Sequence, residues 1–233
     1  MPAELNIQSK LENHLKYSPL PHEVRLWGET MVYSIILFIV VSGYYFVTSG
    51  SFTEKVLNRA VGDVALLMIG LSLILSSVCY FWDFADKYII YRKHLGLVGV
   101  GYLLFHIIFS VTFSSYAPFP GYFLEDKRIA SFIGAVLATI IFFIMTAISN
   151  RFAIHEIGAA RWRKLMRLGH LAFVFTLFHF GVKGLPYWLP WMTGKSDAIF
   201  PSFGLIVFLF GSVVILLRIA LWFSTMKKTD IKV

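Results

Sequence analysis

Residues 61–82 read VGDVALLMIGLSLILSSVCYFW, a run of 22 residues whose only charged side chain, Asp63, lies close to its start. An α-helix rises about 1.5 Å per residue, so a helix of this length crosses the ~30 Å hydrocarbon core of a bilayer. Charged side chains are costly at that depth, which is why such runs are almost free of them. The run therefore predicts a membrane-spanning helix.

Five further apolar runs of similar length accompany it, at 31–48, 95–115, 130–149, 165–183 and 200–223. The chain of 233 residues is 58% hydrophobic and 15% charged, with a mean hydropathy of +0.72. A soluble domain of this size cannot bury so much apolar surface. The predicted fold class is an all-α membrane protein, a six-transmembrane-helix bundle.

A polar N-terminal segment and a short polar tail flank one predicted transmembrane domain. Residues 1–30 contain no early apolar core and do not resemble a cleaved signal peptide. Residues 31–223 form one predicted transmembrane domain, and 224–233 form a short polar tail. The single cysteine, Cys79, cannot form an internal disulfide or a dithiol couple, which excludes the membrane dithiol oxidoreductases.

The basic residues predict the orientation, because lysine and arginine beside membrane spans concentrate on the cytoplasmic side. Placing both the N-terminus and the C-terminus in the cytoplasm puts fifteen of the 21 basic residues inside and six outside. This distribution explains the net charge of +8 without a nucleic-acid partner. The six predicted outer residues are Lys55, Arg59, Lys127, Arg128, Lys183 and Lys195.

Seven histidines are the candidate chemical groups. Four of them, His14, His22, His94 and His155, lie in polar inner segments, where a solvated or headgroup-facing side chain is expected. The other three, His106, His170 and His179, lie inside predicted spans, where an ionisable group usually marks a site.

His106 and His179 lie on two spans that run in the same direction, at roughly 16 and 20 Å from their inner ends. Two imidazoles at matched depth suit axial ligation of a haem iron from opposite faces. Hydrogen bonds to neighbouring helices explain the spacing equally well. A zinc site is less favoured, because the spans offer no cluster of Cys, Asp or Glu to complete four ligands. His170 precedes His179 by nine residues and falls on the opposite helix face, which favours helix packing.

Several ordered motifs resemble a known family. Arg92-Lys93-His94-Leu95-Gly96-Leu97 precedes Leu104-Phe105-His106, and Leu168-Gly169-His170 precedes Thr176-Leu177-Phe178-His179 with Gly184 beyond. The segment 146–150, Trp162 and Pro201-Ser202-Phe203 add to the pattern. Over roughly residues 55–220 the chain resembles the ferric-reductase-like transmembrane superfamily. It is most similar to the transmembrane domain of the STEAP metalloreductases, with the haem protein MsrQ as a relative.

The resemblance implies that residues 31–223 bind one b-type haem in the outer half, with His106 and His179 as the axial ligands of the iron. Two-haem relatives carry a second histidine pair at positions that here hold Arg92 and Met166. Arginine does not ligate iron, so a second, inner haem is not expected. The relatives bind flavin at that level. Accordingly, FAD or FMN is expected here at Arg92, Lys93, Trp162, Lys164 and Arg167, unless these residues serve only as positive-inside anchors.

One departure from the family concerns the electron donor. STEAP enzymes carry a nicotinamide-binding domain before the spans, whereas this chain has about thirty residues there and no G-x-G-x-x-G. We therefore expect a membrane oxidoreductase of the plasma or bacterial inner membrane that needs a separate donor: a cytoplasmic flavin reductase, reduced flavin or quinol. The expected acceptor is chelated ferric or cupric ion or a redox protein. An anionic chelate would meet Lys127, Arg128, Lys183 and Lys195, above Tyr187, Trp188 and Trp191, although those aromatics equally fit an interfacial belt.

Two other classes of function remain open from the sequence. A haem-free transporter or assembly factor would use the intramembrane histidines for substrate or protons. Against it, Asp63, Asp83 and Asp86 are expected at span ends rather than at the membrane midplane. A purely structural haem subunit of a larger redox complex, or a homo-oligomer, would leave no readable signature on lipid-facing helices.

Overall fold

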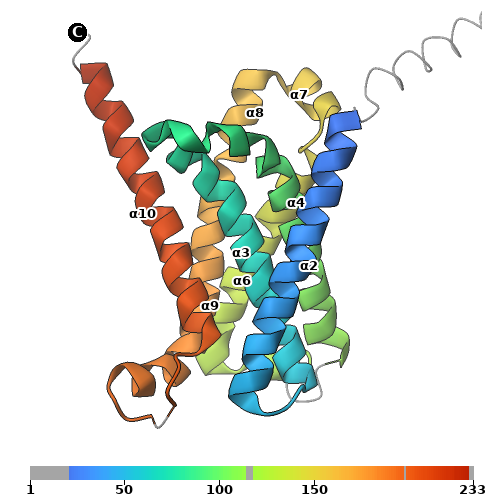
Figure 1. Cartoon of the computed structure of the whole chain (residues 1–233), viewed down its shortest axis with the longest axis vertical. Helices are drawn as coiled ribbons and strands as arrows, with labels where there is room; N and C mark the ends of the chain where they lie inside the picture. The colour runs from blue at the N-terminus through green and yellow to red at the C-terminus, as the bar shows by residue number, and fades with distance from the viewer. Residues whose placement is uncertain (1–20, 114–117, 197, 231–233) are drawn as a thin grey trace, which may run out of the picture.

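Six long apolar helices make up the bundle that the described residues form (Figure 1). The structure, a computed structural model, describes residues 21–113, 118–196 and 198–230. Every regular element within these ranges is helical, and six helices are long and apolar enough to cross a membrane. The predicted all-α class and the six predicted spans are confirmed at this level, and the chain is a multi-pass membrane protein.

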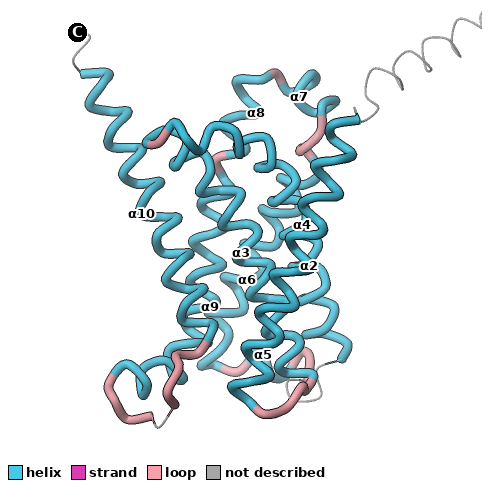
Figure 2. Tube along the Cα trace, in the orientation of Figure 1, coloured by secondary structure: helices cyan, strands magenta, loops and turns pink. Residues whose placement is uncertain are grey.

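The elements follow one another with short connections, as the tube in Figure 2 shows. The long helices are α2 (Pro21–Ser49), α3 (Glu54–Phe81), α4 (Arg92–Ile108), α6 (Asp126–Ala147), α9 (Leu168–Met192) and α10 (Phe203–Asp230). The short elements are η1 (Asp83–Tyr91), η2 (Phe109–Phe113), α5 (Gly121–Leu124), α7 (Arg151–Ile157) and α8 (Ala159–Met166).

The bundle has two distinct ends (Figure 1). At one end, here called the termini end, lie the start of α2, η1, α7, α8 and the last turns of α10. The opposite end, the loop end, carries α5 and the connections 50–53 and 193–202. Both ends of the described chain therefore lie on the same side of the bundle, as an even number of spans requires.

Several helices extend beyond their predicted spans, and α2 and α9 do so most clearly. Within the described residues, helix α2 extends back to Pro21 rather than starting at residue 31, because the polar residues of its first turns find partners. Glu23, for example, binds Arg151 at 3.1 Å. Helix α9 continues to Met192 although Pro186 and Pro190 lie inside it. Hydropathy alone does not detect such polar or proline-containing helical turns.

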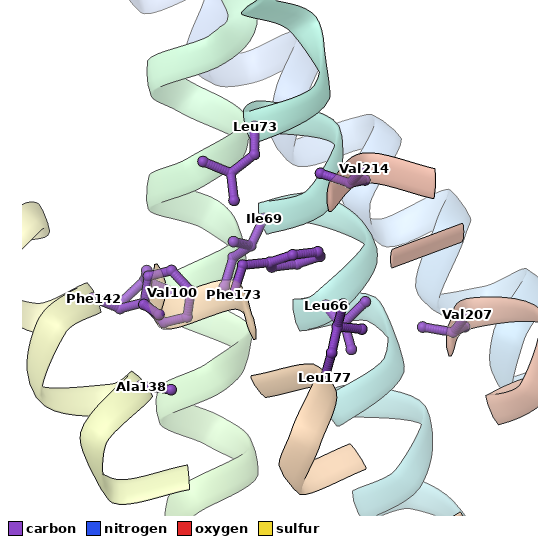
Figure 3. Close-up of a cluster of buried hydrophobic side chains, with 11 residues drawn as sticks. Leu66, Ile69, Leu73, Val100, Ala138, Phe142, Phe173, Leu177, Val207 and Val214 are labelled. Carbon is purple, nitrogen blue, oxygen red and sulfur yellow. The ribbon is translucent and has the colours of Figure 1, made fainter. Parts of the chain in front are cut away.

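Helix α3 forms the centre of the bundle and packs against α2, η1, α4 and α10. Its Leu66, Ile69 and Leu73 meet Phe173 of α9 and Val214 of α10 in the main apolar core (Figure 3). Gly99 allows α4 to approach α3 closely, since a Cβ there would lie 2.7 Å from Cγ1 of Ile69. These contacts fix how α4 and α9 stand relative to each other.

Many large apolar side chains lie on the outer surface. On α2, the exposed side chains include Val32, Ile35, Ile36 and Ile39, each more than half accessible. A water-soluble monomer rarely exposes contiguous apolar surface on this scale. This distribution fits a bundle surrounded by hydrocarbon chains.

Candidate functional site

Two intramembrane histidines have the same local geometry. His106 lies near the end of α4, and its Nδ1 is 3.0 Å from the backbone carbonyl oxygen of Asn58 in α3. His179 lies in α9, and its Nδ1 is 2.9 Å from the carbonyl oxygen of Ser131 in α6. A carbonyl oxygen only accepts, so each Nδ1 must carry the proton and donate it. Each neutral ring then presents a bare Nε2 lone pair, the form in which histidine ligates metals.

The second ring nitrogen, Nε2, is the remaining ligating atom of each residue. Within the described ranges, neither Nε2 takes part in a hydrogen bond or an ion pair. Helices α4 and α9, which carry the two histidines, both run from the termini end toward the loop end. The two Nε2 atoms are therefore the candidates for a shared ligand.

Helices α3 and α6 position this pair. Asn58 is buried, and its side-chain amide donates to Ser110 Oγ at 3.0 Å, beyond His106 on the same chain segment. Gly62, one turn after Asn58, leaves room for the ring, because a Cβ there would lie 3.0 Å from Nδ1 of His106. Ser131 is 1% exposed, and its hydroxyl donates to the carbonyl oxygen of His179 at 3.2 Å.

The arrangement fits a haem better than a mononuclear metal site with three or more protein ligands. Helices α4 and α9 do not pack side by side: α4 packs on α3, and α9 packs on α6. No group of three or more His, Cys, Asp or Glu side chains comes together in the described ranges. Two imidazoles with aligned tautomers on separated helices supply the donor set of a bis-histidine haem.

A cationic surface lies beyond the pair toward the loop end. The ammonium of Lys183, one turn after His179, is 5.3 Å from the ring centre of Phe123, and the Arg128 guanidinium is 4.0 Å from that of Tyr122. The Lys183 ammonium also lies 6.0 Å from the ring centre of Tyr122, the same ring that Arg128 covers. The predicted acceptor residues Lys183 and Arg128 are thus brought together.

The other two predicted residues of the acceptor site are Lys127 and Lys195. The side chain of Lys127 lies outside the described part of the chain, and Lys195 lies in the exposed connection after α9. Arg59, which the motif analysis did not assign to this site, interacts electrostatically with Lys183, and its guanidinium is 5.3 Å from the ring centre of Tyr187. Arg59 lies in α3 because that helix begins at Glu54, earlier than the predicted span.

The predicted aromatic floor of the acceptor site is partly wrong. Tyr187 is exposed, but Trp188 is only 4% exposed and packs between Phe180 and Phe208. Trp188 is therefore a core residue of α9 and α10. Trp191 donates from its indole nitrogen to the carbonyl oxygen of Ala198 at 3.1 Å, which closes the loop after α9.

The predicted flavin-site residues near the termini end separate into two groups. Lys93 is paired with Glu23 at 3.8 Å, and the indole of Trp162 donates to the carbonyl oxygen of Ile148 at 2.9 Å. Those contacts give Lys93 and Trp162 structural roles. Arg92, Lys164 and Arg167 make no ion pair within the described ranges.

Two polar side chains lie where the sequence did not predict them. Asp63 was expected at a span end, but α3 begins nine residues before it, and the carboxylate is 2% exposed and accepts a 2.5 Å hydrogen bond from Tyr45. His94 was expected to be solvated, but it is 2% exposed and packs edge-on against Trp27 at 5.1 Å between ring centres. His22 and His155 are exposed as expected, and His14 lies outside the described residues.

Comparisons with known proteins assign no family. No protein-family model matches the chain, and a search of curated proteins finds no significant match. The site is therefore interpreted from its geometry.

Proposed function

We propose that this chain carries electrons across the membrane on a single b-type haem, held by His106 and His179. The observation that carries the proposal is the shared tautomer: each Nδ1–H is bonded to a backbone carbonyl, which leaves two Nε2 lone pairs on separated helices. A bound haem would supply a one-electron centre within the low-dielectric bundle. The chain would orient the imidazoles and exclude water from them.

The route of the electrons follows from the two ends of the bundle. Basic residues favour a cytoplasmic termini end, where reduced flavin, a separate flavin reductase or quinol would deliver electrons. The cationic surface of Lys183, Arg128 and Arg59 at the loop end would attract an anionic acceptor, such as a chelated ferric or cupric ion, or an acidic redox protein. A chain that works in this way would be a metalloreductase-type membrane oxidoreductase, as its resemblance to the ferric-reductase-like proteins implies.

The test is a reduced-minus-oxidised optical spectrum of protein expressed with added haem. The wild type should show a low-spin b-type signal, and His106→Ala and His179→Ala should each lose it. His155→Ala, which changes an exposed histidine, is the matched control and should keep it. A wild type without haem, or single variants that keep the low-spin signal, would contradict the proposal.

One observation favours a second candidate, a haem-free transporter or assembly factor that relays protons. Asp63 and Tyr45 form a buried hydrogen-bonded pair inside the bundle. An acidic side chain therefore lies within the membrane-spanning region, where the sequence did not predict one. Under this alternative the protein purifies without haem, and Asp63→Asn abolishes proton movement in sealed vesicles. Stoichiometric haem in the wild type would exclude it.

A further inference from the structure

Three arginines near the termini end have no acidic partner in the part of the chain that the structure describes. They belong to three different helices or helix ends: Arg92 begins α4, Arg167 directly precedes α9, and Arg218 lies in α10. None of them forms an ion pair within the described ranges, although Glu23, Glu29 and Glu125 all pair with other basic residues. Unpaired guanidinium groups so close together repel one another, which favours an anion between them.

Packing on α3 places the three arginines at one level. Ser72 of α3 donates to the carbonyl oxygen of Arg92 at 2.6 Å. The next residue, Leu73, packs with Val214, one turn before Arg218, in the core cluster of Figure 3. A Cβ on Gly169, two residues after Arg167, would lie 3.4 Å from Leu73. Consistent with this, the charge of Arg218 interacts with those of Arg92 and Arg167.

A buried polar group points to the same place. His170 interacts electrostatically with both Arg92 and Arg218, and neither of its ring nitrogens is solvent-accessible or hydrogen-bonded within the described ranges. Shielded polar atoms of this kind are normally satisfied. The expected helix-packing role of His170 does not supply such a partner, whereas a bound oxyanion would.

The surroundings match an amphiphile rather than a small soluble anion. Toward its C-terminal end α10 diverges from the rest of the bundle (Figure 1). Large apolar side chains beside the arginines are exposed there, namely Leu168, Leu171, Leu216, Ile219 and Trp222. Basic groups between helices at the cytoplasmic level, next to exposed apolar surface, are suited to a phospholipid headgroup with its acyl chains alongside.

We propose that Arg92, Arg167 and Arg218, together with His170, bind the phosphate of an anionic phospholipid between α4, α9 and α10. The site is separate from the histidine pair near the loop end and does not depend on the haem proposal. These residues differ from those expected to bind a flavin phosphate. Lys93 and Trp162 have other partners, and Arg218 is added.

The experiment is native mass spectrometry of delipidated protein in neutral detergent. Phosphatidylglycerol is added, and phosphatidylcholine with the same acyl chains serves as the zwitterionic control. The wild type should retain one phosphatidylglycerol and no phosphatidylcholine, and Arg218→Gln should reduce its occupancy at least tenfold. Arg218→Lys, which keeps the charge, should retain part of it, and Arg161→Gln, which removes an exposed charge at the same end, should change nothing.

Two results would overturn the proposal. One is equal loss of phosphatidylglycerol in Arg161→Gln and Arg218→Gln, which would indicate diffuse attraction. The other is Arg218-dependent binding of FMN or inorganic phosphate, measured by calorimetry, without binding of phosphatidylglycerol, which would assign the site to a soluble phosphate. Elution volume and thermal unfolding identify any variant that fails to fold, and Arg92→Gln then provides the independent second variant.

Discussion

Two groups of Ser131 contact His179: the carbonyl oxygen lies 2.9 Å from Nδ1 of the imidazole, and the hydroxyl lies 3.0 Å from the same nitrogen and donates to the histidine carbonyl oxygen at 3.2 Å. The carbonyl fixes the tautomer of the ring, because it can only accept. The hydroxyl joins α6 to α9.

Ser131→Ala tests this division of roles. The variant keeps the carbonyl that accepts from Nδ1, so we expect it to retain haem with an unchanged low-spin spectrum. It loses the hydroxyl contact, so the free energy of unfolding should fall by about 1 kcal/mol, the usual net value of a hydrogen bond. Optical spectra and thermal unfolding in detergent measure the two effects. Loss of haem without loss of stability would show that the hydroxyl orients the ring.

Gly62→Ala tests how tightly α3 holds His106. The new Cβ would lie 3.0 Å from Nδ1 and 3.1 Å from Cε1 of the ring, so the imidazole must move by a few tenths of an ångström. We expect several-fold lower haem retention during dilution or competition with apomyoglobin. Gly43→Ala is the matched control, because nothing lies within 4 Å of its added Cβ. Equal haem retention in both variants would contradict the geometry at Gly62.

Tyr45→Phe tests the buried pair in α2 and α3. The substitution removes the donor to the carboxylate of Asp63 and leaves that group buried without its partner, which costs about 1–3 kcal/mol. A lower thermal midpoint is expected, and the double variant with Asp63→Leu should recover part of the loss. Tyr33→Phe, at an exposed position, should leave the midpoint unchanged. Unaltered stability in Tyr45→Phe would mean that the hydrogen bond contributes little.

Lys183→Gln tests the cationic surface near the loop end. If this surface attracts anionic acceptors, an anionic ferric chelate at low ionic strength should oxidise the pre-reduced variant several-fold more slowly than the wild type. The difference should shrink as salt increases, because screening weakens such attraction. Lys87→Gln, in η1 at the termini end, removes the same charge and should have no effect. Stopped-flow spectroscopy follows the haem signal, and a rate independent of Lys183 would argue against this entry route.

The orientation of the bundle is tested by cysteine labelling in a Cys79→Ser background. His22→Cys marks the termini end and Lys195→Cys the loop end, and both native side chains are exposed. An impermeant maleimide added to intact cells should label only Lys195→Cys. Labelling of His22→Cys instead would invert the topology derived from the basic residues.

The sequence predicted helix number and position well, because long apolar runs leave the backbone only one way to satisfy its hydrogen bonds in lipid. It did not predict the ends of the helices. Helix α3 extends back to Glu54 through Asn58 and Arg59, polar residues that a hydropathy criterion assigns to a loop. That extension is what supplies the carbonyl for His106 and buries Asp63.

The candidate site was predicted in part for the same reason. Residue type and depth single out His106 and His179, but their tautomers depend on carbonyls of Asn58 and Ser131 in other helices, which sequence spacing does not reveal. Likewise, Lys93 appeared equivalent to Arg92 in sequence, yet only Lys93 meets a glutamate.

The central position of α3 has a consequence for biogenesis. Its Gly70 lies against Phe210 of the last helix, about 140 residues later, so close that a Cβ would be 2.6 Å from the ring. During synthesis the early helices leave the ribosome with that side of α3 still in contact with lipid or with the insertion machinery. The interior is sealed only when α10 emerges, so chains truncated before residue 203 would insert their spans but remain open along α3.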